Sequence, residues 1–334
     1  MEQSYTMRIT LEHGSGGRKT DELIKRHFLR YFNGKEIRKM DDGANFGGGF
    51  VISTDTFVVN PVFFPGGNIG DLAVAGTVND LVSMGAEPLF LTAGFVLEEG
   101  FDTQDLEEVL RTMSDHLERL NMELLTADTK VVEARDPGNP GIFINTTGIG
   151  RVYRELPGRE GIRAGDVVIV TGAVGEHGFA VLAHRLNLSS SIKSDTKPLW
   201  GLIKPLLDQV DVKFMRDPTR GGLAQTLNEI VENMSFGIKI FENSIPLKDE
   251  VRGLSELLGI DPLEVANEGK MIVILPESQA EKAINILKKH PHGKEASVIG
   301  IITEAHPGVV TIENPYGAER ILYKPTSEKL PRIC

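Results

Sequence analysis

Strand-like and helix-like patterns alternate along this 334-residue chain, and one polar stretch divides them into two groups. Residues 50–59 are rich in β-branched and aromatic residues, as in a strand, and apolar residues recur at helical spacing between Leu106 and Leu120. After the polar, glycine-containing stretch 154–166, a second apolar run begins at Val167 and three further helical patterns follow. Because strands and helices interleave on both sides of the break, we predict two mixed units of the α/β or α+β class.

The polar stretch predicts a domain boundary near residue 152, between an N-terminal domain, 1–152, and a C-terminal domain, 153–324. The last segment, 325–334, contains two prolines and lacks a helical period, so we predict an extended and mobile tail. If this tail is fully extended, the steps from residue 324 to Cys334 span about 33 Å. The terminal residue can therefore reach a site well away from the point where the tail leaves the domain.

The composition excludes several classes of protein. The chain has 36 basic and 47 acidic residues, and this net charge of −11 argues against nucleic acid as a partner. A single cysteine forbids an intrachain disulfide and fits a reducing compartment. The first residues lack the layout of a signal peptide, and no apolar run is long enough to span a membrane. We therefore expect a cytoplasmic protein with no membrane partner.

A glycine cluster links the first predicted strand to the first predicted helix. Backbone amides at such a helix start suit a phosphate group. The spacing matches neither a Walker A loop nor a dinucleotide-binding fingerprint, and a plain glycine turn is the alternative. The candidate phosphate-binding residues in this cluster are Gly14, Ser15, Gly16, Gly17 and Lys19.

Acidic residues stand at the ends of several apolar segments. Mg²⁺ in nucleotide sites is bound by carboxylate oxygens together with the substrate phosphates. The alternative is that each aspartate caps a helix or a turn, and the sequence alone does not show that they converge. The candidates are Asp41, Asp42, Asp55, Asp80 and Asp128.

Further charged residues are candidates for anion binding or proton transfer. Lys130 lies two residues after Asp128, so on a strand both point to one face. The lysine there either binds phosphate, sheds a proton if it is desolvated, or is a solvated surface residue. Arg216 and Arg220 flank a glycine-rich helix start that is a second candidate anion site. Glu268 precedes an apolar strand and is either a general base or part of a plain turn.

The only cysteine, Cys334, is the last residue of the sequence. Arg332 lies two residues before it and can favour the thiolate, which is the nucleophilic form. The alternative is an exposed thiol without a role.

These motifs together resemble the HypE family of hydrogenase maturation factors, and the resemblance covers essentially the whole chain. Several of them are also similar to motifs of a wider superfamily that includes aminoimidazole ribonucleotide synthetase, selenophosphate synthetase and thiamine-phosphate kinase. The terminal Pro-Arg-Ile-Cys is the motif that narrows the resemblance to HypE. The motifs are HGSGGRKT, DDGA, STDTFVVNPVFFPGGNIGDLAVAGTVNDLVSMGA, TADTKVV, RDPTRGGLA, NEGKMIV and PRIC.

The resemblance implies a two-domain fold of the aminoimidazole ribonucleotide synthetase type and a homodimer. In this family the N-terminal sheets of two subunits join into a β-barrel, and ATP lies near that interface. The partner HypF carbamoylates the terminal cysteine, and HypE uses ATP to dehydrate the resulting thiocarboxamide to a thiocyanate. The cyanide is then passed to iron on the HypC–HypD complex, destined for [NiFe] hydrogenase.

The resemblance also implies a role for individual residues. Cys334 matches the cysteine that carries the substrate, and Lys130 and Glu268 match positions that remove protons from the thiocarboxamide nitrogen. The acidic Mg²⁺-nucleotide positions are matched by Asp42, Asp80, Asp128 and Asp217. Contacts to ATP are matched by Gly14–Lys19, Asp41, Thr54 and Asp55, and Arg151 is a further candidate near the tail.

Two other functions stay open at this point. The chain can be another ATP-dependent enzyme of the superfamily that acts on a small free substrate, although its N-terminal loop lacks the cysteine that selenophosphate synthesis needs. It can also be a nucleotide-binding scaffold whose terminal cysteine docks a partner. A terminal thiol has no use in a purine or thiamine enzyme, which favours the HypE interpretation.

Overall fold

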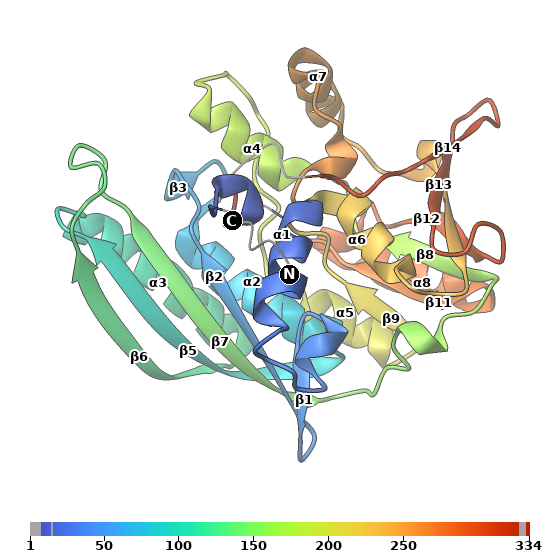
Figure 1. The fold of residues 1–334 in the computed structure, drawn as a ribbon, viewed down its shortest axis with the longest axis horizontal. Helices are drawn as coiled ribbons and strands as arrows, with labels where there is room; N and C mark the ends of the chain where they lie inside the picture. The colour runs from blue at the N-terminus through green and yellow to red at the C-terminus, as the bar shows by residue number, and fades with distance from the viewer. Residues whose placement is uncertain (1–7, 15, 327–331) are drawn as a thin grey trace, which may run out of the picture.

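The protein folds around two β-sheets that lie side by side (Figure 1). The computed structural model describes residues 8–14, 16–326 and 332–334. Both halves combine strands with helices, so the prediction of mixed α/β units is confirmed.

The first sheet has the strand order β1-β2-β7-β5-β6, and β6 is one of its edges. Neighbouring strands run antiparallel except for β5 and β6, which are parallel. Its strands are β1 (Ala44–Gly47), β2 (Phe50–Phe57), β5 (Ala86–Glu98), β6 (Glu123–Val132) and β7 (Ile142–Val152).

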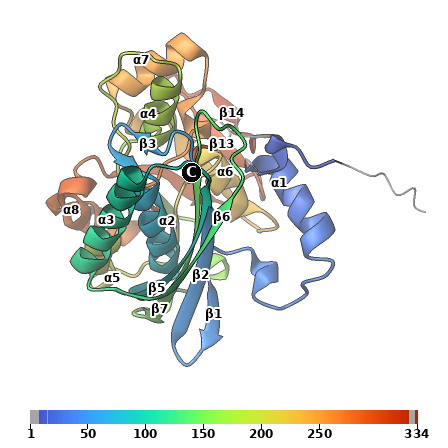
Figure 2. The ribbon, with the colours of Figure 1, turned by 90° about the vertical axis from the view of Figure 1, so that its left-hand side faces the viewer.

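Helices α2 (Ile69–Ser83) and α3 (Thr103–Leu120) lie on the same side of this sheet (Figure 2). Helix α2 is built from small residues and is buried almost throughout, so it can approach its neighbours closely. At Gly76, for example, a Cβ atom would lie only 2.8 Å from the ring of Phe57 on β2. Helix α3 buries the stripe Val109, Met113 and Leu117, as its periodicity predicts.

The second sheet has the order β14-β13-β10-β12-β8-β11-β9. Its strands are β8 (Asp166–Val170), β9 (Phe214–Arg216), β10 (Gly237–Phe241), β11 (Ile272–Pro276), β12 (Ser297–Thr303), β13 (Val310–Glu313) and β14 (Glu319–Ile321). The helices of this half are α4 (Glu176–Arg185), α5 (Trp200–Leu207), α6 (Gly222–Val231), α7 (Asp249–Leu258) and α8 (Ala280–Lys289).

One apolar cluster connects the two halves. It runs from Phe57 and Ile144 of the first sheet through Leu72 of α2 to Leu202 of α5 and Val273 of β11. Helix α2 is therefore packed between the first sheet and the C-terminal half. Side chains of α2 can therefore contact loops of both halves, and Asp80 near the end of α2 lies where the two halves meet.

The N-terminal segment and the chain end both return to this region (Figure 1). Helix α1 (Gly17–Leu23) follows the 3-10 turn η1 (Leu11–Gly14) and continues into the π-helical turn η2 (Ile24–Phe28). The short strands β3 (Phe63–Phe64) and β4 (Gly67–Asn68) form a hairpin beside the C-terminus. In the described part of the chain, we find no helix with the length and apolar character needed to cross a membrane.

Candidate active site

Three aspartates that are far apart in the sequence meet between the two halves of the chain. Asp42 follows the 3-10 turn η3 (Ile37–Lys39), Asp80 lies in the last turn of α2, and Asp217 directly follows β9. One carboxylate oxygen of each lies within 4.8 Å of those of the other two. We call Asp42, Asp80 and Asp217 the acidic cluster. Its oxygen-only donors are those that Mg²⁺ prefers.

The acidic cluster is electrostatically unfavourable by itself. Burial, followed by repulsion from Asp217 and Asp42, raises the pKa of Asp80 well above its ordinary value. Burial and repulsion from Asp42 raise the pKa of Asp217 in the same way. Arg216, whose Nε lies 3.1 Å from Asp42 Oδ1, is the nearest compensating charge, yet the pKa of Asp42 is still raised by burial. A divalent cation fits this cluster because it relieves the mutual repulsion.

Local structure fixes the orientation of Asp80. Helix α2 begins with a capping box in which Asn68 and Asp71 exchange hydrogen bonds with backbone amides. The helix then carries Asp80 to its C-terminal turn, where the helix dipole does not favour a negative charge. Ser53 of β2 donates a hydrogen bond from Oγ to Asp80 Oδ2 at 2.5 Å. The carboxylate is thus held in place although its electrostatic surroundings oppose ionisation.

An Asp80→Asn variant is expected to be more stable than the wild type when divalent cations are removed. The amide keeps an acceptor for Ser53 and removes one of three repelling charges, so the melting temperature in chelator is expected to rise by about 2–4 °C. Added Mg²⁺ should raise the melting temperature of the wild type more than that of the variant. Calorimetry with and without Mg²⁺ measures both effects, and a less stable variant in chelator would contradict the repulsion.

A cavity of about 460 Å³ opens beside the acidic cluster. Asp41 and Asp42 line it together with Arg216, and apolar side chains such as Met84 and Phe214 form other parts of the wall. Cavities of this size, with apolar walls and a few charged groups, are typical of small-molecule sites. A ligand in this cavity would lie next to Asp42.

Glu268 is buried close to the acidic cluster, and its side chain is poorly satisfied. Its Oε1 atom is buried and has no hydrogen-bond partner among the described residues. Burial, then repulsion from Asp217 and Asp55, raises the pKa of Glu268 well above its ordinary value. Asn267, the preceding residue, donates from Nδ2 to Pro218 O at 3.0 Å and so ties this turn to the loop after Asp217. A buried acceptor without a donor costs about 1–3 kcal/mol unless a ligand satisfies it.

Asp55 belongs to the same region as the acidic cluster. It lies on β2 and is half-buried. Burial raises its pKa, whereas the positive charge of Arg220 acts in the opposite direction. The structure therefore brings together Asp42, Asp55, Asp80, Asp217 and Glu268, all of which were predicted site residues.

The predicted phosphate loop contacts the start of the tail. Gly16 and Gly17 have φ values of 84° and 76°, which favour glycine. The amides of Arg18 and Lys19 donate to the carbonyl oxygens of Pro325 and Thr326 at 3.1 and 3.3 Å. Gly14 accepts a hydrogen bond on its carbonyl from Arg220, whereas Lys19 forms an exposed ion pair with Glu12. Ser15 lies outside the described residues.

The last three residues dock between the two halves of the chain. Val58 and Asn60 donate backbone hydrogen bonds to main-chain oxygens of Cys334 and Arg332, at 3.1 and 3.2 Å. His177 on α4 donates from Nε2 to the Ile333 carbonyl at 2.7 Å. The Ile333 side chain is buried in the apolar cluster, and Cys334 is half-buried beside it. The end of the tail is held in this structure, and the mobility of the tail stays a prediction.

Lys130 and Asp128 lie apart from this region, on the edge strand β6. They form an ion pair with each other, and both side chains are mostly exposed. All ten residues of β6 are exposed, including the apolar Leu125 and Val131. Within one chain, therefore, the structure does not bring Lys130 or Asp128 to the acidic cluster.

Thr54 and Arg151 lie on the first sheet. Thr54 is exposed on β2 and donates from Oγ1 to Thr146 O at 3.1 Å. Arg151 pairs with Glu87 at 2.9 Å and lies opposite Phe50, at the end of β2 that is farther from Val58 and the docked cysteine.

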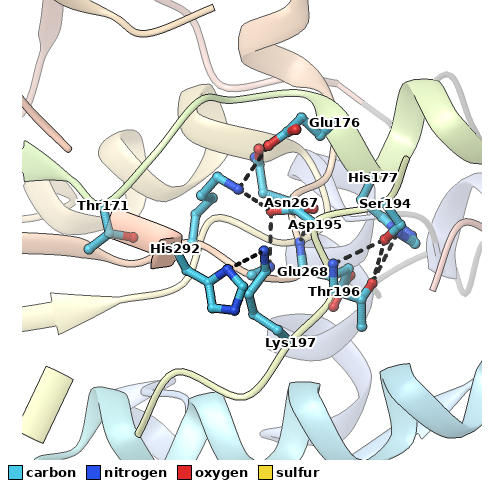
Figure 3. Close-up of polar contacts among 12 residues, drawn as sticks. Thr171, Glu176, His177, Ser194, Asp195, Thr196, Lys197, Asn267, Glu268 and His292 are labelled. Carbon is cyan, nitrogen blue, oxygen red and sulfur yellow. Dashed lines mark hydrogen bonds and ion pairs between the residues drawn. The ribbon is translucent and has the colours of Figure 1, made fainter. Parts of the chain in front are cut away.

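Sequence reasoning missed three buried residues near Glu268 and the tail: His177, Asp195 and Lys270. Figure 3 shows His177 and Asp195 in the same region as Glu268. Lys270 immediately follows the turn that contains Glu268, which is a weak signal. His177 stands in an ordinary helical pattern, and Asp195 stands in a loop without a recognisable motif. Their proximity depends on tertiary structure and could not be read from spacing.

Comparison with known proteins gives consistent results over the whole chain. Residues 40–152 match the N-terminal domain of the AIR synthase related proteins, and residues 163–313 match their C-terminal domain. The chain is 41% identical to carbamoyl dehydratase HypE of Azotobacter vinelandii over 333 residues, covering 98% of this chain and 97% of the relative.

Two solved structures are similar to the chain over nearly their full length. The crystal structure of a HypE–HypF complex matches with a TM-score of 0.85 and 43% identity, covering 91% of this chain and 99% of the other. A crystal structure of HypE in complex with ATP matches with a TM-score of 0.81 and 41% identity, covering 98% and 100%. With its two AIR synthase related domains and its 41% identity to HypE proteins over nearly the whole chain, this chain belongs to the HypE family of carbamoyl dehydratases.

Proposed function

We propose that this protein uses ATP to dehydrate a carbamoyl group on its own Cys334 to a thiocyanate. The thiocyanate then supplies the cyanide ligand for iron in [NiFe] hydrogenase maturation. Two observations carry the proposal. The terminal cysteine is docked by its backbone between the two halves of the chain, and Glu268 is a buried carboxylate whose Oε1 has no hydrogen-bond partner among the described residues. Family membership supports the class of reaction.

The reaction balances as follows. The carbamoyl oxygen takes the terminal phosphoryl group of ATP, which releases ADP and turns a poor leaving group into phosphate. Removal of the two N–H protons as phosphate departs leaves S–C≡N. Glu268 is suited to accept a proton because burial raises its pKa and its Oε1 has a free lone pair. A buried position also limits hydrolysis of the activated group by water.

The acidic cluster is suited to hold the nucleotide. A relative of this chain has been solved in complex with ATP, and the cavity beside Asp42 is large enough for a small-molecule ligand. Asp42, Asp80 and Asp217 would hold Mg²⁺, which neutralises charge on the phosphates when it is bound. Asp55 lies close enough to influence Asp80 electrostatically and would contact the nucleotide from β2.

The tail serves as a tethered substrate carrier. Its end is docked by hydrogen bonds to Val58, Asn60, His177 and Arg185, and none of these contacts is covalent, so the tail can leave and return. HypF has been solved in complex with a relative of this chain and is the proposed source of the carbamoyl group. The HypC–HypD complex is the proposed acceptor of the cyanide, and both partners require the tail to leave its dock.

A homodimer would explain the position of Lys130. Register across the sheet runs from Lys130 through Val96 to Phe143, which is next to Ile144, the partner of Phe57. Lys130 is therefore separated from Val58 by three strand spacings, or about 14 Å. Exposed apolar residues on an unpaired edge strand indicate a further pairing surface. We propose that the first sheets of two subunits close into a barrel in which β6 of one subunit lies beside β2 of the other, where β1 leaves β2 uncovered beyond Ile52. The partner subunit's Lys130 then serves the docked Cys334.

Mixing two inactive variants tests this arrangement. Lys130→Ala and Cys334→Ala homodimers are each expected to lack dehydration, whereas heterodimers formed after subunit exchange should recover activity. Recovery is expected because the Lys130→Ala chain supplies Cys334 and its partner supplies the lysine. The recovered rate is measured as thiocyanate on the C-terminal peptide. Absence of recovery in confirmed heterodimers would show that Lys130 acts within its own chain or not at all.

The proposed function is tested by the mass of the C-terminal peptide. Incubation with HypF, carbamoyl phosphate and ATP should add one carbamoyl group, followed by the loss of one water that requires ATP on this protein. Carbamoylation without any loss of water would overturn the proposal and leave a scaffold that docks a partner through its tail. Turnover of a small free substrate without an adduct would favour the other enzymes of the superfamily.

A further inference from the structure

One short loop contacts both His177, which binds the docked tail, and the turn that carries the candidate base. Residues Ser194, Asp195 and Thr196, here called the bridge segment, lie between α4 and α5 (Figure 3). We propose that the bridge segment sets the position of the tail relative to Glu268, with His177 and Asp195 as positioning residues. The inference rests on the proposed function in taking Glu268 as the base, but the docking contacts stand independently of it.

Asp195 holds the backbone on both sides of the Glu268 side chain. Its Oδ1 accepts from the amide of Glu268 at 3.2 Å, and its Oδ2 accepts from the amide of Gly269 at 3.1 Å. A Cβ atom at Gly269 would lie 1.9 Å from Asp195 O, so only glycine fits there. The turn that presents Glu268 is therefore built directly on Asp195.

Asp195 is itself held by a buried ion pair. Lys270 Nζ lies 3.0 Å from Asp195 Oδ2 and 3.0 Å from Glu176 Oε2, and Lys270 and Asp195 are almost completely buried. Lys248 pairs with the other oxygen of Glu176 at 2.5 Å. Substitution of one partner in a buried pair of this kind destabilises the fold, because the remaining charge is left uncompensated. The network keeps the carboxylate of Asp195 fixed as an acceptor.

The other end of the bridge segment orients His177. The Ile333 carbonyl can only accept, so His177 Nε2 carries the proton and Nδ1 is an acceptor. Ser194 Oγ lies 2.8 Å from Nδ1 and donates to it, while Thr196 Oγ1 lies 2.6 Å from Ser194 Oγ and donates in turn. The hydroxyls thus satisfy Nδ1 in the tautomer that binds the tail.

Ser194, which orients His177, and Asp195, which holds the Glu268 turn, are neighbours in the backbone. The Ser194 amide donates to Pro65 O at 2.7 Å, which ties the bridge segment to the loop that leads from Val58 and Asn60. A displacement of the segment would move His177 and Glu268 differently, and Cys334 would lose its alignment with the base. Misalignment of reacting groups by a fraction of an ångström to 1 Å can cost a large part of a rate enhancement.

The single cysteine allows docking and chemistry to be measured separately. The first readout is the rate at which Cys334 of the unmodified protein reacts with an aromatic disulfide reagent. The second is the single-turnover rate of water loss from protein that HypF has carbamoylated beforehand. Ser194→Ala removes the hydroxyl, Ser194→Thr restores it, and Ser191→Ala removes a hydroxyl from an exposed position of the same loop as a matched control.

Ser194→Ala is expected to react with the thiol reagent about tenfold faster than the wild type, the effect of one weakened buried hydrogen bond. Its dehydration should slow by a similar factor, whereas Ser194→Thr and Ser191→Ala should behave as the wild type. Asp195→Asn should keep the thiol protected but slow dehydration at least tenfold. If Asp195→Asn does not fold, His177→Phe is the second variant, and its Cys334 thiol is expected to react faster than that of the wild type.

The outcomes separate this inference from the proposed function. Equal thiol rates in Ser194→Ala and Ser191→Ala, or wild-type dehydration in a folded Asp195→Asn protein, would overturn the positioning role. If the wild-type thiol is protected and Ser194→Ala exposes it, but no water is ever lost, the docking contacts are supported and the proposed chemistry is wrong.

Discussion

A Cys334→Ala variant is expected to bind ATP and to form no carbamoyl adduct at all. Cys334 is the only thiol in the chain, so no other residue can replace it. The substitution leaves the acidic cluster untouched, and alanine keeps the Cβ of the half-buried side chain that packs against the apolar cluster. The variant is therefore expected to lose carbamoylation completely and to keep ATP binding. Intact mass measures the first property and ATP titration of the same preparation measures the second.

A displaced thiol provides the matched control for this experiment. Cys334→Ala combined with Ser191→Cys carries one thiol on an exposed loop of the same fold. It is expected to remain unmodified, because the carbamoyl group must be presented on a tail that HypF can engage and that can return to the dock. An adduct on Cys334→Ala itself would show that the thiol assignment is wrong.

Local patterns were sufficient to predict the class of the fold. The stripe from Leu106 to Leu120 became α3, and the apolar run at 50–59 became β2, because both features depend only on residues close in sequence. Strand order in the two sheets depends on contacts between distant segments. No periodic pattern in β10 or β12 indicates that they are neighbours, although they pair antiparallel.

The candidate site was predictable in part for the same reason. Aspartates at segment ends were individually ambiguous, and only the packing of α2 between the halves shows that Asp42, Asp80 and Asp217 meet. Lys130 is a candidate by its spacing from Asp128, and its role at the thiocarboxamide comes only from the resemblance. Its exposure on β6 shows that one chain does not complete the site with it. Asp195 carried no sequence signal because its role comes from contacts with Glu268 and Lys270.

A Glu268→Gln variant is expected to accumulate the carbamoylated protein and to lose water at least 100-fold more slowly. General bases typically contribute a factor of 10² to 10⁴, and glutamine has nearly the same shape but cannot accept the proton. Carbamoylation should proceed at the normal rate, since in the proposed function HypF modifies the tail after it has left the site. The measurement is the time course of adduct and thiocyanate masses in a single turnover.

Stability distinguishes loss of a base from loss of a fold in this variant. The pKa of Glu268 is raised in the folded protein, so its ionised form is less favourable there than in the unfolded chain. Stability therefore decreases as pH rises from the ordinary carboxyl pKa of the unfolded chain to the folded-state pKa, and it does not decrease further above that pKa. Glutamine removes this dependence, and Glu268→Gln should unfold at the same temperature as the wild type or higher near neutral pH. Glu277 is exposed and directly follows β11, the strand that Glu268 precedes. Glu277→Gln should change neither the rate of water loss nor the unfolding temperature. Wild-type water loss in a stable Glu268→Gln protein would remove Glu268 from the mechanism and leave proton transfer to Lys130, because no other predicted residue was assigned that role.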